Sequence, residues 1–193
     1  MMKASLEKLL NGDAEVLARR LLGSLISRET DGQILVGKIV ETEAYDQTDA
    51  ASHSYHGKTP RIEVMFGPAG RAYVYFTYGM HHCFNVVVGP EGRASAVLIR
   101  AIEPLKGQEV MKFNRKNPSS EINLTNGPAK FCQAFLIDRR LNGHDLSELP
   151  LKLELKPSIK NSEIITTTRI GISRDIDRPW RFYIKDNPYV SKI

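Results

Sequence analysis

The sequence predicts a single α+β domain, in which helices surround a curved antiparallel β-sheet with a protruding β-hairpin. Short segments rich in β-branched and aromatic residues recur along the chain and are separated by turn-forming residues. Helical periodicity is confined to a few short segments. No internal repeat or linker divides the 193 residues, so one domain is expected over residues 1–193.

The N-terminal part predicts a helix followed by a hairpin. The helix runs from Asp13 to Leu22, because Asp13 can cap it, apolar residues recur at helical spacing and Gly23 suits its exit. A strand at 25–28 then leads to Asp31-Gly32, a pair typical of a two-residue hairpin turn. The return strand is expected at 34–45.

The middle of the chain predicts the protruding hairpin. Residues 71–78 are rich in aromatic and β-branched residues and form its first strand. The chain turns at Gly79–His82 and returns at 83–88. A further strand at 94–102 is expected to stop at Glu103-Pro104, because a proline restricts the residue before it and cannot donate to a ladder.

Two helices and three short strands complete the prediction. The helices are expected at 108–115 and 128–136, and Pro128 suits the first turn of the second one. The strands are expected at 151–155, 168–172 and 181–184.

Composition narrows the classes of function. The net charge of +5 and the pI near 9.2 favour an anionic partner. No apolar stretch could span a bilayer and no secretion signal is present, and Cys83 and Cys132 lie in segments expected to be buried. We therefore expect an intracellular protein with reduced thiols, in the cytoplasm or nucleoid if bacterial. Phosphate-binding, dinucleotide-binding and serine-hydrolase motifs are absent.

Glu41, Glu43 and Tyr45 are spaced by two on one predicted strand and share a face. Two carboxylates and a phenol cannot line an apolar core. Either this face is solvated or it lines a cleft. In a cleft, mutual repulsion and desolvation would raise the pKa of one carboxyl and make it a usable base.

Other residues also fit poorly in a plain core. Tyr78 and Met80 lie at the predicted hairpin tip, where they either pack on a neighbouring loop or form a wedge that enters a nucleic-acid groove. Asn85 and Arg100 interrupt apolar strands. They are either structural residues with satisfied partners or donors to a ligand on the sheet.

His53, His81 and Glu43 are side chains of the types that bind metal ions. The spacing matches no common zinc signature, and His81 and His82 are adjacent on a strand and point to opposite sides. We therefore expect no metal and no cofactor.

Beyond these features, the chain resembles the alkyladenine (3-methyladenine, methylpurine) DNA glycosylase family. The similarity covers nearly the whole chain, is weakest over 106–121, and is specific through its ordered set of motifs. The matching segments are Ile39–Tyr45, Ala51–Ser54, Lys58–Arg61, Val64–Gly67, Tyr73–Tyr75, Tyr78–Met80 with Asn85, Ala96–Pro104, Gly127–Lys130, Arg169–Ile172 and Pro179–Tyr183.

The resemblance implies an enzyme that flips a damaged purine out of duplex DNA and hydrolyses its glycosidic bond, without a lyase step. Glu43 would be the general base that activates water. Tyr45 and Tyr75 would sandwich the flipped base together with His53, and Tyr78 would intercalate into the duplex.

The resemblance also implies roles for two polar residues on the sheet. Asn85 would discriminate against normal guanine, and Arg100 would order the catalytic site. The residues expected to contact the DNA backbone are Met80, Lys58, Arg61 and Lys130. The partner would be double-stranded DNA with damaged purines, and a monomer would suffice.

Three rival interpretations stay open on the sequence. The chain could be a non-catalytic nucleic-acid-binding module, a metal-dependent hydrolase that uses His53, His81 and Glu43, or a lyase-type glycosylase with a lysine nucleophile. The preferred lesion among 3-methyladenine, 7-methylguanine, hypoxanthine and ethenoadenine does not follow from the sequence.

Overall fold

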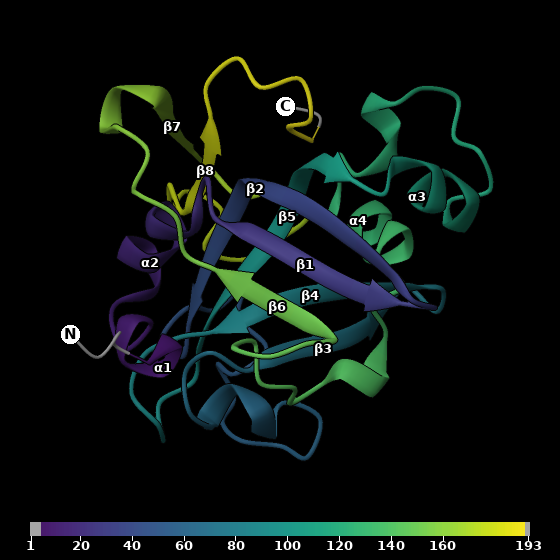
Figure 1. The fold of residues 1–193 in the computed structure, drawn as a ribbon. Coiled ribbons are helices and arrows are strands. Elements are labelled where there is room, and N and C mark those ends of the chain that lie inside the picture. Colours follow the sequence, from purple (N-terminus) through teal and green to yellow (C-terminus); the bar gives the residue numbers. More distant parts are fainter. Residues whose placement is uncertain (1–4, 192–193) are drawn as a thin grey trace.

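The computed structural model describes residues 5–191, which form one domain on a curled antiparallel sheet (Figure 1). Six strands follow the order β3-β4-β5-β2-β1-β6, β8 pairs with β2, and β7 pairs with β8. The strands are β1 Leu25–Thr30, β2 Gln33–Asp46, β3 Ala72–Thr77, β4 His81–Val87, β5 Ser95–Lys106, β6 Leu151–Glu154, β7 Ile164–Thr167 and β8 Arg181–Ile184. The predicted fold class is confirmed.

Strand β2 is the longest strand and joins the two parts of the sheet. Its N-terminal half pairs with β1, a later stretch pairs with β8, and β5 runs along its other edge. The register between β2 and β5 shifts on both sides of Glu41. Such irregularities bend a strand and increase its twist, so they allow the sheet to curl at this point.

Within residues 5–191 the α-helices are α1 Leu6–Leu9, α2 Ala14–Leu21, α3 Gln108–Asn114 and α4 Pro128–Ala134. In Figure 1, α1 and α2 lie on the left of the view and α3 and α4 on the right, and residues of α2 and α4 belong to the same core. The Asp13 carboxylate accepts hydrogen bonds from the N–H groups of Glu15 (2.8 Å) and Val16 (3.3 Å), so α2 begins where predicted. None of the described helices is long and apolar enough to cross a membrane.

Alternation along the strands divides the sheet into two chemically different faces. Val74 and Phe84 belong to the main core, which α2 and α4 cover. Tyr75 and Asn85, from the same two strands, line a cavity on the opposite face. The polar residues that fit poorly in a core therefore share the second face.

Two predicted strand boundaries are wrong. Strand β5 continues through Pro104 to Lys106, because the register with β2 slips by one residue at this position, and a proline is tolerated at a bulge. Residues 168–172 form a loop, and the strand that pairs with β8 lies earlier, at Ile164–Thr167. In that loop Arg169 is buried and Gly171 has φ +77°, so the apolar spacing was not a sign of a strand.

Candidate active site

The register of the sheet brings four residues into one row across adjacent strands. Tyr73 on β3 pairs with Asn85 on β4, Asn85 pairs with Leu98 on β5, and Leu98 pairs with Glu43 on β2. Neighbouring strands lie about 4.8 Å apart. Residues separated by up to 55 positions in the chain thus share one strip of the sheet.

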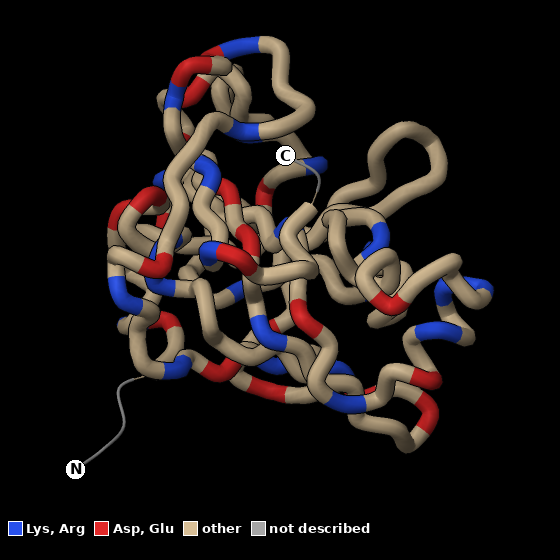
Figure 2. Tube along the Cα trace, turned by 90° about the horizontal axis from the view of Figure 1, so that it is seen from above, with Lys and Arg blue, Asp and Glu red and all other residues tan. Residues whose placement is uncertain are grey.

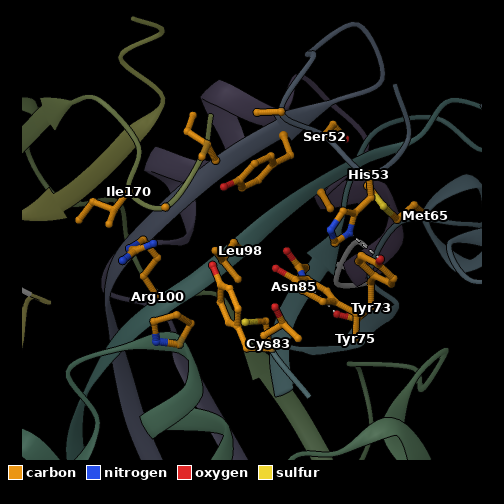
Figure 3. A pocket seen from close by; sticks show the side chains of 18 residues that line it. Ser52, His53, Met65, Tyr73, Tyr75, Cys83, Asn85, Leu98, Arg100 and Ile170 are labelled. Carbon is orange, nitrogen blue, oxygen red and sulfur yellow. Dashed lines mark hydrogen bonds between the residues drawn. The ribbon is translucent and has the colours of Figure 1, made fainter. Parts of the chain in front are cut away.

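A cavity of about 350 Å³ lies against this strip (Figure 3). Its walls come from β2 to β5, from the loop at 51–53 and from the segment at 170–172. Figure 3 shows Arg100 and Ile170 on one side and the rings of His53, Tyr73 and Tyr75 on the other. The volume falls in the range of roughly 300–1,000 Å³ that is typical of small-molecule sites.

Glu43 is fully buried, and its carboxylate accepts two hydrogen bonds and forms one ion pair. Oε2 accepts from the Tyr45 hydroxyl at 2.8 Å. Oε1 accepts from the backbone N–H of Ile170 at 2.8 Å and lies 3.1 Å from Nη1 of Arg100. The interpretation of a solvated Glu41–Glu43–Tyr45 face is therefore wrong, and all three partners of Glu43 belong to residues that line the cavity.

Glu41 is also fully buried, but it forms an ion cluster beside the cavity. Its Oε1 accepts from Nε of Arg100 at 2.9 Å and from Nε of Arg181 at 2.7 Å, and Oε2 accepts from the N–H of Ser191 at 2.7 Å. Burial raises the pKa of the Glu41 carboxyl, but Arg100, Arg181 and Ser191 outweigh burial and hold it below its ordinary value. Glu41 is therefore not the carboxyl whose pKa was expected to rise, because Arg100 and Arg181 balance its charge.

Arg100 joins the two carboxylates. Its Nε contacts Glu41 and its Nη1 contacts Glu43, so one guanidinium fixes the distance between them. Although burial lowers the pKa of Arg100, Glu43 and Glu41 raise it above the ordinary value. Arg100 is therefore a permanent cation on the cavity wall.

Aromatic rings form the opposite wall. His53 packs edge-on against Tyr75, with ring centroids 4.6 Å apart, and its Nδ1 lies 3.0 Å from the Tyr73 hydroxyl. Burial and the charge of Arg61 lower the pKa of His53, so the ring is uncharged at pH 7. Burial raises the pKa of Tyr73 to about 12 and also raises those of Tyr45 and Tyr75, so all three remain neutral phenols.

Asn85 lies at the cavity and is buried. Its Nδ2 donates to the carbonyl of Tyr73 at 3.1 Å. The Nδ2 atom of Asn85 is thus hydrogen-bonded within the protein, and this bond fixes the orientation of the side chain at the cavity. A structural role is therefore confirmed for Nδ2 of Asn85, and a contact with a ligand stays a prediction.

The tip of the β3–β4 hairpin exposes two large side chains. Tyr78 is 81% exposed and Met80 is 69% exposed. The interpretation that the tip packs on a neighbouring loop is therefore wrong. Tyr78 also lines the mouth of the cavity and has φ +50°, an uncommon conformation for a residue other than glycine.

The basic residues predicted to hold DNA occupy different surroundings. Lys58 forms an ion pair with Glu63 at 3.0 Å, and Arg61 approaches the carbonyl of Phe76 at 3.5 Å. Lys130 donates to the side chain of Asn126 at 2.7 Å. Figure 2 shows basic and acidic residues interspersed along the chain, so in this view charge alone does not outline a nucleic-acid surface.

The residues considered as metal ligands do not converge. His53 is engaged by Tyr73, and Glu43 is engaged by Arg100, whereas His81 is exposed at the start of β4. Between residues 5 and 191, no group of three His, Cys, Asp or Glu side chains is placed to hold a metal ion. The proposed ligand set of a metal-dependent hydrolase is therefore not assembled.

Several residues of the site carry no local signal in the sequence. Ile170 contributes a backbone N–H, and Ser191 contacts Glu41 across 150 positions. Arg169 and Asp49 form a buried ion pair behind Tyr45. Of these residues, only Arg169 and Ile170 were indicated by the sequence, because they lie in the segment 169–172 that resembles a family motif.

Comparison with known proteins identifies the family of this chain. The family model described as methylpurine-DNA glycosylase (MPG) matches residues 8–188. Relatives provisionally named 3-methyladenine DNA glycosylases include one from Carboxydothermus hydrogenoformans, 55% identical over 93% of this chain and 94% of its own. Others come from Clostridium botulinum, 49% identical over 93% and 95%, and Desulfitobacterium hafniense, 48% identical over 94% and 95%. The chain therefore belongs to the methylpurine-DNA glycosylase family, enzymes of DNA base-excision repair that hydrolyse N-glycosyl bonds.

Proposed function

We propose that this glycosylase flips alkylated or deaminated purines out of duplex DNA into the cavity and hydrolyses their N-glycosyl bond with a water activated by Glu43. The observation that carries the proposal is the placement of Glu43. A fully buried carboxylate is oriented by three residues of the wall of an aromatic cavity. An oriented carboxylate at such a place is a candidate general base.

The aromatic walls supply the binding energy for the extruded base. Flipping costs a few kcal/mol, and stacking returns roughly 1–3 kcal/mol per aromatic contact. Tyr45 and Tyr75 on the cavity walls, with His53 beside Tyr75, can therefore offset most of that cost. Because all these rings are neutral, the pocket accepts both cationic and neutral purines.

Oε2 is the oxygen of Glu43 that can take a proton from water. Oε1 already accepts from the Ile170 N–H and pairs with the Arg100 guanidinium, whereas among residues 5–191 Oε2 accepts only from the Tyr45 hydroxyl. A carboxylate oxygen has two lone pairs, so Oε2 keeps one acceptor position. Glu43 is fully buried in the free enzyme, so the proposal requires that a water reaches Oε2 when the base and sugar are in place.

The reaction then balances as a hydrolysis. The water oxygen attacks the anomeric carbon of the deoxyribose, Glu43 takes the water proton, and the N-glycosyl bond breaks with its electron pair moving to the base. An alkylated purine cation leaves as a neutral base. Hypoxanthine, which is neutral, takes up a proton from the solvent as it departs, so that water is added across the bond. The products are an abasic site and a free base, with no lyase step.

The remaining residues have supporting roles in this proposal. Tyr78 fills the gap that the extruded base leaves in the duplex. Asn85 rejects the exocyclic amine of normal guanine, and Arg100 keeps the charge of Glu43 balanced. The proposed contacts to the DNA backbone are Met80, Lys58, Arg61 and Lys130.

The decisive experiment is an excision assay on duplexes that carry single modified purines, with chelator present. The wild-type enzyme should release the base, and Glu43→Gln should bind the same duplex with similar affinity but release none. Persistent excision by Glu43→Gln would remove Glu43 from the role of base. Loss of activity with chelator and its return with zinc, or trapping of a protein–DNA adduct by borohydride, would each overturn the metal-free, direct hydrolysis proposed here.

A further inference from the structure

We infer that Arg169 is a positioning residue, which supports the Tyr45 ring from behind and fixes the Glu43 carboxylate through the adjoining backbone. The inference rests on the roles proposed above for Tyr45 and Glu43. Tyr45 and Ile170 line the cavity, but Arg169 does not. It therefore acts through its neighbours and not through contact with the substrate.

The surroundings of Arg169 are those of a fully enclosed cation. Its Nη2 donates to Oδ1 of Asp49 at 2.9 Å, its Nη1 contacts Oδ2 of the same residue, and Nη1 also donates to the carbonyl of Ala44 at 3.0 Å. Its Nε is buried and has no hydrogen-bond partner among the described residues. A buried unpaired donor costs free energy, and a buried ion pair is often no more stabilising than an apolar replacement. Fold stability alone therefore gives no account of this arrangement.

The first effect of Arg169 is on the stacking surface. Its guanidinium lies over the Tyr45 ring, 4.7 Å from the centroid, which is within the distance of a cation–π contact. The Tyr45 ring is also part of the cavity wall. A base that stacks on Tyr45 therefore contacts a ring whose position is fixed by the planar guanidinium of Arg169.

The second effect is on the general base. Ile170 follows Arg169 directly, and its N–H donates to Oε1 of Glu43 at 2.8 Å. The segment at 168–172 lies outside the strands. The contacts of Arg169 with Asp49 and with the Ala44 carbonyl therefore anchor this segment beside Glu43. One side chain thus sets the position of a ring used in binding and of a carboxylate used in chemistry.

The test is the substitution Arg169→Lys, which keeps the charge but loses the planar group and the two-pronged contact with Asp49. Single-turnover excision from a duplex with one hypoxanthine or ethenoadenine should fall about 10-fold or more, since small misplacement of catalytic groups has effects of this size. Binding to the lesion duplex should weaken, whereas binding to an undamaged duplex should stay unchanged. Thermal unfolding must show that the variant is folded at the assay temperature.

Arg19→Lys is the matched control. The Arg19 guanidinium also lies over an aromatic ring, 4.3 Å from the centroid of Phe182, and pairs with Glu15 at 3.6 Å, but none of these three residues lines the cavity. Excision by this control should equal that of the wild type. If Arg169→Lys is folded and excises and binds lesions as the wild type does, the inference is wrong.

Two further variants keep the inference falsifiable. If Arg169→Lys does not fold, Asp49→Glu displaces the guanidinium without removing it and should slow excision in the same way. In a cycle with Tyr45→Phe, the two losses should be non-additive, because both substitutions disturb the same ring and carboxylate. Additive losses would refute the coupling. Failure of the wild-type enzyme to excise any lesion would refute the proposed function instead, so the two failures are distinguishable.

Discussion

The substitution Glu41→Gln tests the ion cluster that supports the site. It removes one carboxylate that accepts from Arg100, from Arg181 and from both the N–H and the hydroxyl of Ser191. Arg100 keeps Glu43 as a partner, but Arg181 is left buried without an ion-pair partner in the cluster. Removal of one partner of a buried pair costs about 3–5 kcal/mol. For a protein of this size, the melting temperature should fall by roughly 6–20 °C.

The pH dependence of this loss follows from the lowered pKa of Glu41. A carboxyl whose pKa is lower in the folded state stabilises the fold above its unfolded pKa, and this contribution is lost as the pH falls through the folded value. The difference in unfolding free energy between the wild type and Glu41→Gln should therefore be full at pH 7 and should shrink below about pH 4.5, the ordinary value.

Urea denaturation from pH 3 to pH 7 measures this difference directly. Glu63→Gln is the control, because Glu63 pairs with Lys58 on the exposed surface and its loss should change stability little. A loss of under about 1 kcal/mol for Glu41→Gln at pH 7, or a difference that stays constant at acid pH, would refute this account of the cluster.

Two further predictions concern the cavity and its mouth. Tyr78→Ala should leave stability almost unchanged, because the side chain is exposed. The substitution should weaken binding to a duplex with an abasic site more than binding to an intact duplex, as measured in a competition assay. Equal weakening of both would show that Tyr78 does not act as a wedge. Burial and the charge of Arg61 lower the pKa of His53 in the folded protein. The uncharged ring therefore stabilises the fold above the ordinary pKa of about 6.5, and this stabilisation should be lost as the pH falls below 6.5 and through the pKa of the folded state. Urea denaturation between pH 5 and pH 8 should show this dependence in the wild type and not in His53→Gln, and identical curves would contradict it.

Local signals predicted most of the fold. The Asp13 cap and the Asp31-Gly32 turn depend on neighbouring residues only, and both elements form where expected. The two errors arose where tertiary pairing decided the outcome. Pro104 stays within β5 because β2 accommodates a register slip beside it, and residues 168–172 are held as a loop by a buried arginine.

The site was predictable only in part for the same reason. The spacing of Glu43 and Tyr45 on one strand correctly placed them on one face, and their side chains are hydrogen-bonded. The partners that orient them come from distant positions, since Ile170 is 127 residues from Glu43 and Arg169 is 120 residues from Asp49. No local pattern encodes such contacts, because they depend on how β2 lies beside the loop after β7.

The geometry of the occupied site tests the central claim most directly. The measurement is a crystal structure of the enzyme on a duplex that carries an uncleavable analogue of a damaged purine nucleotide. We expect the flipped base against Tyr45 and Tyr75, and a water about 2.6–3.2 Å from Oε2 of Glu43 on the side of the anomeric carbon. A base seated outside the cavity, or a Glu43 carboxylate still closed off from any water, would contradict the account.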